Sequence, residues 1–123
     1  MTMADAAEIV SDFRQTMGRG DFASARRLLR DDLSFRGPIG VFDTADAFIE
    51  AWKALPMVVE RVEVRKVFAD GGDVCVLFDL VTKRPAVTVL VAEWYRVTDG
   101  QIAMMRAVFD ARPFAAVLQR DAA

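Results

Sequence analysis

The segment EWYRVTDGQIAMMRAVFD, residues 93–110, contains the strongest fold signal in the chain. Asp99-Gly100 has the composition of a two-residue hairpin turn, and apolar residues recur on both sides of it as they do in strands. In a regular hairpin about this turn the facing pairs are Val97 with Ile102, Tyr95 with Met104, Glu93 with Arg106, and Val91 with Val108. The opposite face then holds Leu90, Ala92, Trp94, Met105, Ala107 and Phe109. Both faces of the predicted hairpin are largely apolar.

Outward from this hairpin, residues from 58 onward follow the period of two that is typical of strands. Turn-forming residues separate the strands at Asp70-Gly71-Gly72-Asp73 and at Lys83-Arg84-Pro85. The predicted strands are residues 58–69, 74–82, 86–97 and 101–109. Consecutive strands joined by short turns predict an antiparallel meander.

Helical signals precede the strands. Apolar residues repeat at helical spacing from Ile9 to Met17, and a second short helix is predicted after Asp21, whose side chain is a good helix cap. The remaining predicted elements are a short strand at 33–36, a turn at 37–40, a third helix from Asp43 or Thr44 to Pro56, and a last helix capped by Asp110. This order predicts an α+β fold in a single domain, residues 1–123, with the helical hairpin and third helix packed on a curved four-stranded meander.

Composition excludes several classes of function. The chain has 16 Lys and Arg against 18 Asp and Glu, a net charge of -2, and no extended basic cluster, which disfavours nucleic-acid binding. No apolar run approaches the ~20 residues that a membrane span needs, and the acidic N-terminus lacks the pattern of a secretion signal. We therefore expect a cytoplasmic protein with no membrane partner.

The chain contains no histidine and one cysteine, Cys75. These counts exclude an internal disulfide, Ser-His and Cys-His nucleophile pairs, and histidine-ligated zinc. Cys75 lies in the apolar run VCVLF, where a free cysteine behaves as a small hydrophobic residue. We expect neither a metal nor another cofactor.

Two segments carry a resemblance to a known family: GDFASARRLLRDDLSFRGPIG, residues 20–40, and the hairpin segment quoted above. Together with the spacing between them, they resemble the SnoaL-like branch of the nuclear transport factor 2-like superfamily over nearly the whole chain. The resemblance implies a cone, in which helices and a bent sheet enclose an apolar pocket, and a dimer formed through the outer face of the sheet. That superfamily includes ketosteroid isomerases, polyketide cyclases, dehydratases, epoxide hydrolases and binding proteins, so the fold does not name the chemistry.

Comparison with the ketosteroid isomerases tests one of these activities. Their general-base aspartate matches Gly37, their oxyanion-hole tyrosine matches Phe13, and their oxyanion-hole aspartic acid matches Ala92. Proton abstraction beside a carbonyl needs a base and hydrogen-bond donors, which these three residues do not supply. The sequence therefore predicts that this protein is not a ketosteroid isomerase.

Asp79 is the one ionisable residue within VCVLFDLV and is a weak candidate for a catalytic carboxylate. The stronger interpretation is a carboxylate that pairs with Arg65 or Lys66. The apolar residues predicted to contact a ligand are Phe13, Phe35, Trp52, Trp94, Met105 and Phe109.

Three functions remain open at this point. The favoured one is a protein that binds a small apolar or aromatic metabolite, the first alternative is a cofactor-free cyclase, lyase or isomerase with a pocket carboxylate, and the second is a dimerisation module with a filled cone. The homodimer is expected on the hairpin face that bears Glu93, Tyr95, Met104 and Arg106, with Glu93 and Arg106 paired across strands.

Overall fold

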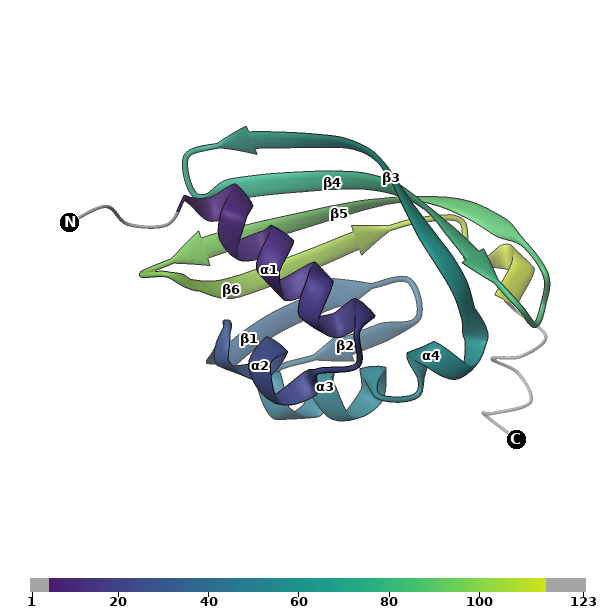
Figure 1. Cartoon of the computed structure of the whole chain (residues 1–123), viewed down its shortest axis with the longest axis horizontal. Helices are drawn as coiled ribbons and strands as arrows, with labels where there is room; N and C mark the ends of the chain where they lie inside the picture. The colour runs from purple at the N-terminus through teal and green to yellow at the C-terminus, as the bar shows by residue number, and fades with distance from the viewer. Residues whose placement is uncertain (1–4, 115–123) are drawn as a thin grey trace.

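The computed structural model describes residues 5–114 and shows an α+β fold, as the sequence predicts. Figure 1 shows a curved sheet whose concave face is crossed by the first helix. The helices are α1 (Ala6–Gly18), α2 (Phe22–Arg27), α3 (Ala45–Trp52) and α4 (Leu55–Val58). The strands are β1 (Leu29–Gly37), β2 (Gly40–Phe42), β3 (Val59–Asp70), β4 (Asp73–Thr82), β5 (Thr88–Thr98) and β6 (Gln101–Val108). No helix among residues 5–114 has the length and apolar character needed to cross a membrane.

In the described part of the chain the sheet has six strands in the order β2-β1-β6-β5-β4-β3, two more than the predicted meander. The four predicted meander strands are present and antiparallel. The additional strands are β2 and a long β1, which pairs in parallel with β6. Sequence patterns miss this pairing because it joins segments about seventy residues apart and because the charged pair Asp31-Asp32 interrupts the apolar pattern of β1.

The helix starts follow the predicted caps. The Asp21 side chain accepts a hydrogen bond from the Ser24 N–H, and the Thr44 side chain accepts one from the Ala47 N–H. Pro56 does not end the third helix as predicted, because α3 stops at Trp52 and Pro56 lies in the first turn of α4, where its missing N–H is not needed. The predicted C-terminal helix lies mostly outside the described residues, which end in a short 3-10 turn at Arg112–Phe114.

The register of the β5–β6 hairpin differs from the prediction by one residue. Val97 pairs with Ile102 as expected, but Arg96 pairs with Met104, so Ala103 forms a bulge. Beyond the bulge the pairs are Tyr95 with Met105, Trp94 with Arg106, and Glu93 with Ala107. Because neighbouring residues of a strand face opposite sides, the shift separates Arg106 from Glu93 and places them on opposite faces.

The core lies between the concave face of the sheet and helices α1 and α3. Its most completely buried large side chains are Tyr95, Leu29, Leu33, Ile102 and Met105. These residues come from β1, β5 and β6, the three central strands beneath α1 and α3.

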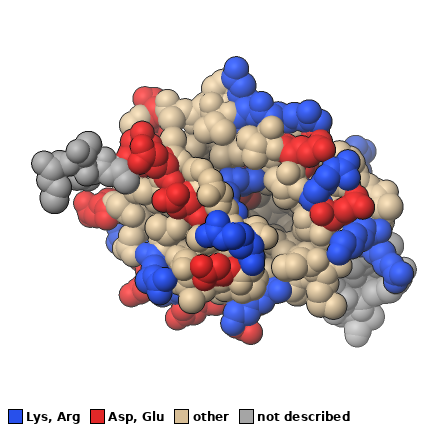
Figure 2. All heavy atoms as spheres, viewed as in Figure 1, with Lys and Arg blue, Asp and Glu red and all other residues tan. Residues whose placement is uncertain are grey.

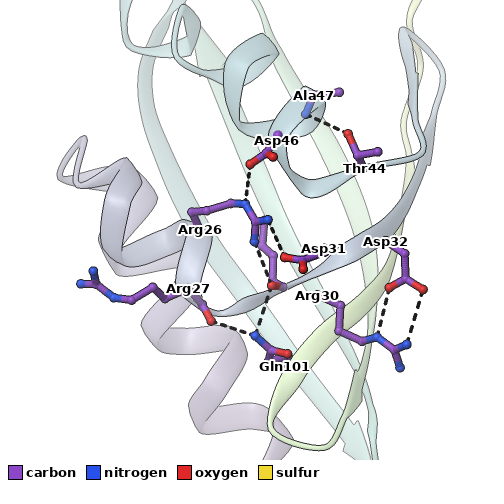
Figure 3. A network of polar contacts seen from close by, with 10 residues as sticks. Arg26, Arg27, Arg30, Asp31, Asp32, Thr44, Asp46, Ala47 and Gln101 are labelled. Atoms are coloured by element: carbon purple, nitrogen blue, oxygen red, sulfur yellow. Dashed lines mark hydrogen bonds and ion pairs between the residues drawn. The ribbon is translucent and has the colours of Figure 1, made fainter.

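A polar network fixes the end of the sheet where β1 and β6 begin (Figure 3). Gln101 Nε2 donates to the carbonyl oxygens of Arg27 at 3.1 Å and Leu29 at 3.3 Å. Arg26 bridges Asp31 and Asp46 at 2.7 Å each. Both carboxylates are largely exposed, so these ion pairs contribute little stability. The Gln101 bonds act together with the backbone bond from Ile102 N–H to the Leu28 carbonyl oxygen, 2.8 Å long, to hold the hairpin beside β1.

Candidate functional site

On the concave face of the sheet, a row of neighbouring residues runs across adjacent strands beside the core. Ala107 on β6 pairs with Glu93 on β5, which in turn pairs with Val76 on β4. Gly37 on β1 adjoins the same row, because a Cβ added there would lie 3.6 Å from the Cβ of Ala107. The row places one carboxylate on an otherwise apolar wall.

Arg14, Glu93 and Tyr95 form a hydrogen-bonded group on this wall, here called the polar cluster. Glu93 and Tyr95 are two residues apart on β5 and therefore face the same side, while Arg14 reaches them from α1. Arg14 Nη1 donates to Glu93 Oε1 at 3.0 Å and to the Tyr95 hydroxyl at 2.8 Å. The Tyr95 hydroxyl donates in turn to Glu93 Oε1. One acidic, one basic and one phenolic group thus meet on the concave face.

Solvent reaches the polar cluster. The side chains of Arg14 and Glu93 are 19% and 15% exposed, although the Arg14 guanidinium stacks 4.2 Å from the centre of the Phe78 ring. Figure 2 shows the surface hollowed near the middle of the face crossed by α1, on the side of α1 toward β3 and α4. The cluster is therefore packed against apolar groups, while the side chains of Arg14 and Glu93 stay in partial contact with solvent.

Burial shifts the ionisation of the cluster. Burial is the largest influence on Glu93 and raises the pKa of its carboxyl above the usual value, although Arg14 and the hydrogen bonds act in the opposite direction. Burial, and then the charge of Glu93, raises the pKa of Tyr95 well above its ordinary value. Burial lowers the pKa of Arg14, but the neighbouring Tyr95 and Glu93 outweigh it and the pKa is raised overall, so this side chain remains a cation.

Aromatic side chains extend from the polar cluster along the interior. Phe13 lies 6.3 Å from Tyr95 between ring centres, Phe48 lies 6.2 Å from Phe13, and Trp52 lies 5.7 Å from Phe48 and 5.8 Å from Phe35. Within residues 5–114, the buried Trp52 Nε1 has no hydrogen-bond partner. An unpaired indole N–H is costly inside a protein and provides a donor for a bound molecule.

Five of the six residues predicted to contact a ligand lie on the concave side. They are Phe13, Phe35, Trp52, Met105 and Phe109, all part of the core or packed against it. Trp94 instead lies on the convex face, 39% exposed, where its Nε1 donates to Asp73 Oδ1 at 2.9 Å. The one-residue register shift does not explain this difference, which concerns the face that is interior: both faces of the hairpin are largely apolar, and the sequence predicts the one with Trp94 as interior.

The convex face also holds Asp79, the predicted catalytic candidate. Asp79 pairs with Arg65, whose Nε lies 2.7 Å from Asp79 Oδ2, as the alternative interpretation of this residue expects. Asp79 is therefore separated from the polar cluster by the thickness of the sheet.

Gly37 stands where a base would point into the interior. A Cβ at this position would lie only 3.1 Å from the Phe35 ring, so the ring fills the space that a side chain would need. Glu93 instead places a carboxylate on the concave face, whereas the sequence predicts a dimer interface on this face of the hairpin.

Sequence reasoning missed the polar cluster although part of its signal was available. Arg14 follows Val10 by four residues and so lies near the apolar stripe of the first helix. Glu93 and Tyr95 were predicted to share a face, which is correct, but that face was assigned to a dimer interface. The prediction of a cross-strand pair between Glu93 and Arg106 is wrong, because Glu93 pairs with Arg14.

Solved structures with the same fold come from proteins of several kinds. An NTF2-like protein of unknown function from Cytophaga hutchinsonii has a TM-score of 0.80 and 22% identity, covering 94% of this chain and 97% of that one. A steroid delta-isomerase from Pseudomonas aeruginosa has a TM-score of 0.78 and 20% identity, covering 96% and 91%. An LEH-like epoxide hydrolase from M. tuberculosis has a TM-score of 0.75 and 23% identity, covering 94% and 90%.

These identities establish a shared fold, and their different activities leave the chemistry of this chain open. No curated protein matches the sequence. The family described as the SnoaL-like domain matches residues 10–105, which include most of α1, most of the meander and every member of the polar cluster. The chain therefore belongs to the SnoaL-like domain family.

Proposed function

We propose that this protein binds a small, mostly apolar or aromatic molecule against the concave face, with the polar cluster holding the polar end of that molecule. The observation that carries the proposal is the cluster itself, an Arg-Glu-Tyr group that is accessible to solvent yet enclosed by Phe78 and Phe13. A buried ion pair adds little net stability compared with apolar residues of similar size. A role in ligand binding explains why an ion pair, and not a set of apolar residues, occupies this part of the concave face.

Two further features favour a binding site over a filled interior. The Trp52 N–H has no acceptor among the described residues, and Ala107 leaves only a methyl group opposite Glu93. A larger residue at position 107 would fill the space beside Glu93. The filled-cone dimerisation module is therefore the less favoured function.

Fluorescence of Trp52 provides the direct test of binding. The chain has two tryptophans, so a Trp94→Phe variant leaves Trp52 as the only indole, next to the proposed ligand. Titration with a panel of aromatic compounds should change its emission and saturate, with affinity that follows ligand hydrophobicity.

Ala107→Leu should weaken this binding by about tenfold or more, since its side chain would occupy the space beside Glu93. The matched control is Ala92→Leu, the same change on the convex face of β5. Absence of saturable binding by any compound in the panel would contradict the proposal, as would equal effects of the two leucine variants.

The alternative is a cofactor-free isomerase, cyclase or lyase in which Glu93 transfers protons. Its support is the raised pKa of Glu93 beside Tyr95, since acid-base residues work best when their pKa lies near the operating pH. Glu93→Gln keeps the shape and removes the ionisable group, so an enzyme would lose turnover but keep binding. A binding protein would show no turnover in either form. We expect no ketosteroid isomerisation, because Gly37 offers no base.

We also propose a homodimer through the convex face, with a different set of residues from the one that the sequence predicts. Glu93 and Tyr95 lie inside and do not belong to this interface. The exposed apolar residues that support it are Phe68 at 52%, Leu90 at 58%, Trp94 at 39% and Val108 at 68% exposure. A depression of about 430 Å³ lies on this face beside Phe68 and Trp94. Apolar residues gathered on one face of a sheet favour burial against a second copy.

A further inference from the structure

The polar cluster leaves specific hydrogen-bonding positions unused. Both contacts of Arg14 use Nη1, so its Nη2 and Nε edge has no partner among residues 5–114. Both hydrogen bonds received by Glu93 go to Oε1, so Oε2 accepts none from the same residues. The Tyr95 hydroxyl accepts from Arg14 and donates to Glu93, and is therefore satisfied. One donor edge of Arg14 and one acceptor atom of Glu93 are thus left without a partner among residues 5–114.

This pattern specifies a complementary ligand group. We infer, on the basis of the proposed binding function, that the ligand is neutral and presents a carbonyl oxygen next to an N–H or O–H, as a carboxamide does. The carbonyl oxygen accepts from the free edge of Arg14, and the neighbouring N–H or O–H donates to Glu93 Oε2. The apolar remainder of the ligand lies toward the aromatic side chains of Phe13 and Phe48.

Other ligand charges fit the cluster less well. A carboxylate would accept from Arg14 but would place its second oxygen against Glu93, where two like charges repel. An ammonium group would meet the Arg14 cation. A ligand with no polar group would displace water from Arg14 and Glu93 without replacing its hydrogen bonds, which costs free energy. A neutral group with an acceptor and a donor leaves the Arg14–Glu93 ion pair intact and satisfies both open positions.

Three probes of nearly equal shape separate these possibilities: benzamide, acetophenone and benzoate. Acetophenone replaces the NH₂ of benzamide with a methyl group, so it keeps the acceptor and loses the donor, while benzoate carries the negative charge. Dissociation constants are measured by calorimetry or ligand-observed NMR at pH 7. We expect benzamide to bind about tenfold more tightly than either of the others, because a site built for a donor discriminates against an analogue that lacks one.

Two variants test which residue binds the donor of the ligand and which binds its acceptor. Glu93→Leu should make benzamide and acetophenone bind equally, whereas Arg14→Met should weaken both and keep their ratio. If Glu93→Leu fails to fold, the double variant Arg14→Met/Glu93→Leu removes both charges together and should show no preference. Asp79→Asn, on the convex face, is the matched control and should preserve the wild-type ratio.

The possible results distinguish failure of this inference from failure of the proposed binding function. Equal binding of benzamide and acetophenone to the wild type, or tightest binding of benzoate, overturns the inference and leaves the binding function standing. Binding of unsubstituted aromatic compounds but of none of the three probes also overturns it. If no compound of either kind binds, the proposed function itself fails.

Discussion

Removing Glu93 alone should destabilise the protein more than removing Glu93 and Arg14 together. The Glu93→Leu variant leaves the Arg14 guanidinium against the Phe78 ring without a counter-ion and deprives the Tyr95 hydroxyl of its acceptor. Breaking one partner of a fully buried pair costs about 3–5 kcal/mol, and an exposed pair is worth about 0.2–1 kcal/mol. The side chains of Arg14 and Glu93 are 19% and 15% exposed, so this pair is closer to the fully buried case. We expect the free energy of unfolding to fall by about 2–3 kcal/mol.

The double variant Arg14→Met/Glu93→Leu removes the stranded charge. What remains is an unsatisfied Tyr95 hydroxyl, which costs about 1–2 kcal/mol. Adding Tyr95→Phe should recover most of that remaining loss. The free energy of unfolding is measured by urea denaturation at fixed protein concentration, with the slope checked for constancy. Single losses below about 0.5 kcal/mol that add in the double variant would show that the polar cluster is not an interior feature.

The raised pKa of Glu93 also predicts how the stability of the folded protein changes with pH. Because the pKa of Glu93 is raised in the folded state, the folded protein binds this proton more tightly than the unfolded chain does. The stabilisation is therefore complete below the ordinary pKa of 4.5 and is lost as pH rises through the raised value. The wild type should lose stability relative to Glu93→Gln over this window. The chain has no histidine, so no imidazole titration overlaps it. An opposite trend would show that attraction to Arg14 outweighs burial.

Three further measurements address other parts of the molecule. Tyr95 is the only tyrosine, so near-ultraviolet absorbance should show no tyrosinate in the folded protein until pH is well above 10, and ionisation near 10 would place the hydroxyl in water. Leu90→Lys should convert the proposed dimer to a folded monomer in sedimentation experiments, whereas Val64→Lys, an exposed site on the other face, should not; a monomeric wild type would refute the dimer. Asp79→Asn should cost less than about 1 kcal/mol in thermal melts, because its partner Arg65 is 58% exposed, and a larger loss would assign Asp79 a role beyond that pair.

The fold was predictable where local chemistry determines structure. The Asp99-Gly100 turn has positive φ at both residues, 51° and 78°, as that hairpin turn requires, and Asp21 and Thr44 cap helices where the sequence places them. Each of these signals involves residues close together in the chain. The parallel pairing of β1 with β6 depends on distant segments and left no comparable local pattern.

The polar cluster was not predicted because two errors combined. The bulge at Ala103 carries no turn-forming residue that would reveal it, so a regular register paired Glu93 with Arg106. Both faces of the hairpin are also apolar enough to be interior, and the sequence pattern favours the face with Trp94. Arg14 lies beside the apolar stripe of the first helix, but no local pattern links it to Glu93, which is 79 residues away in the chain.

The β3 strand has a consequence for how copies of this chain meet. Among the described residues it forms one edge of the sheet, and this strand of twelve residues pairs with β4 alone. An exposed edge of that length invites pairing with another chain and growth into aggregates. Charged side chains along it, linked by the ion pairs of Arg61 and Arg65 with Glu63, and the two breaks in its register make the edge irregular and strongly hydrated. Lateral strand addition is thereby discouraged, which agrees with the proposed dimer through the convex face, a contact between two copies that does not propagate.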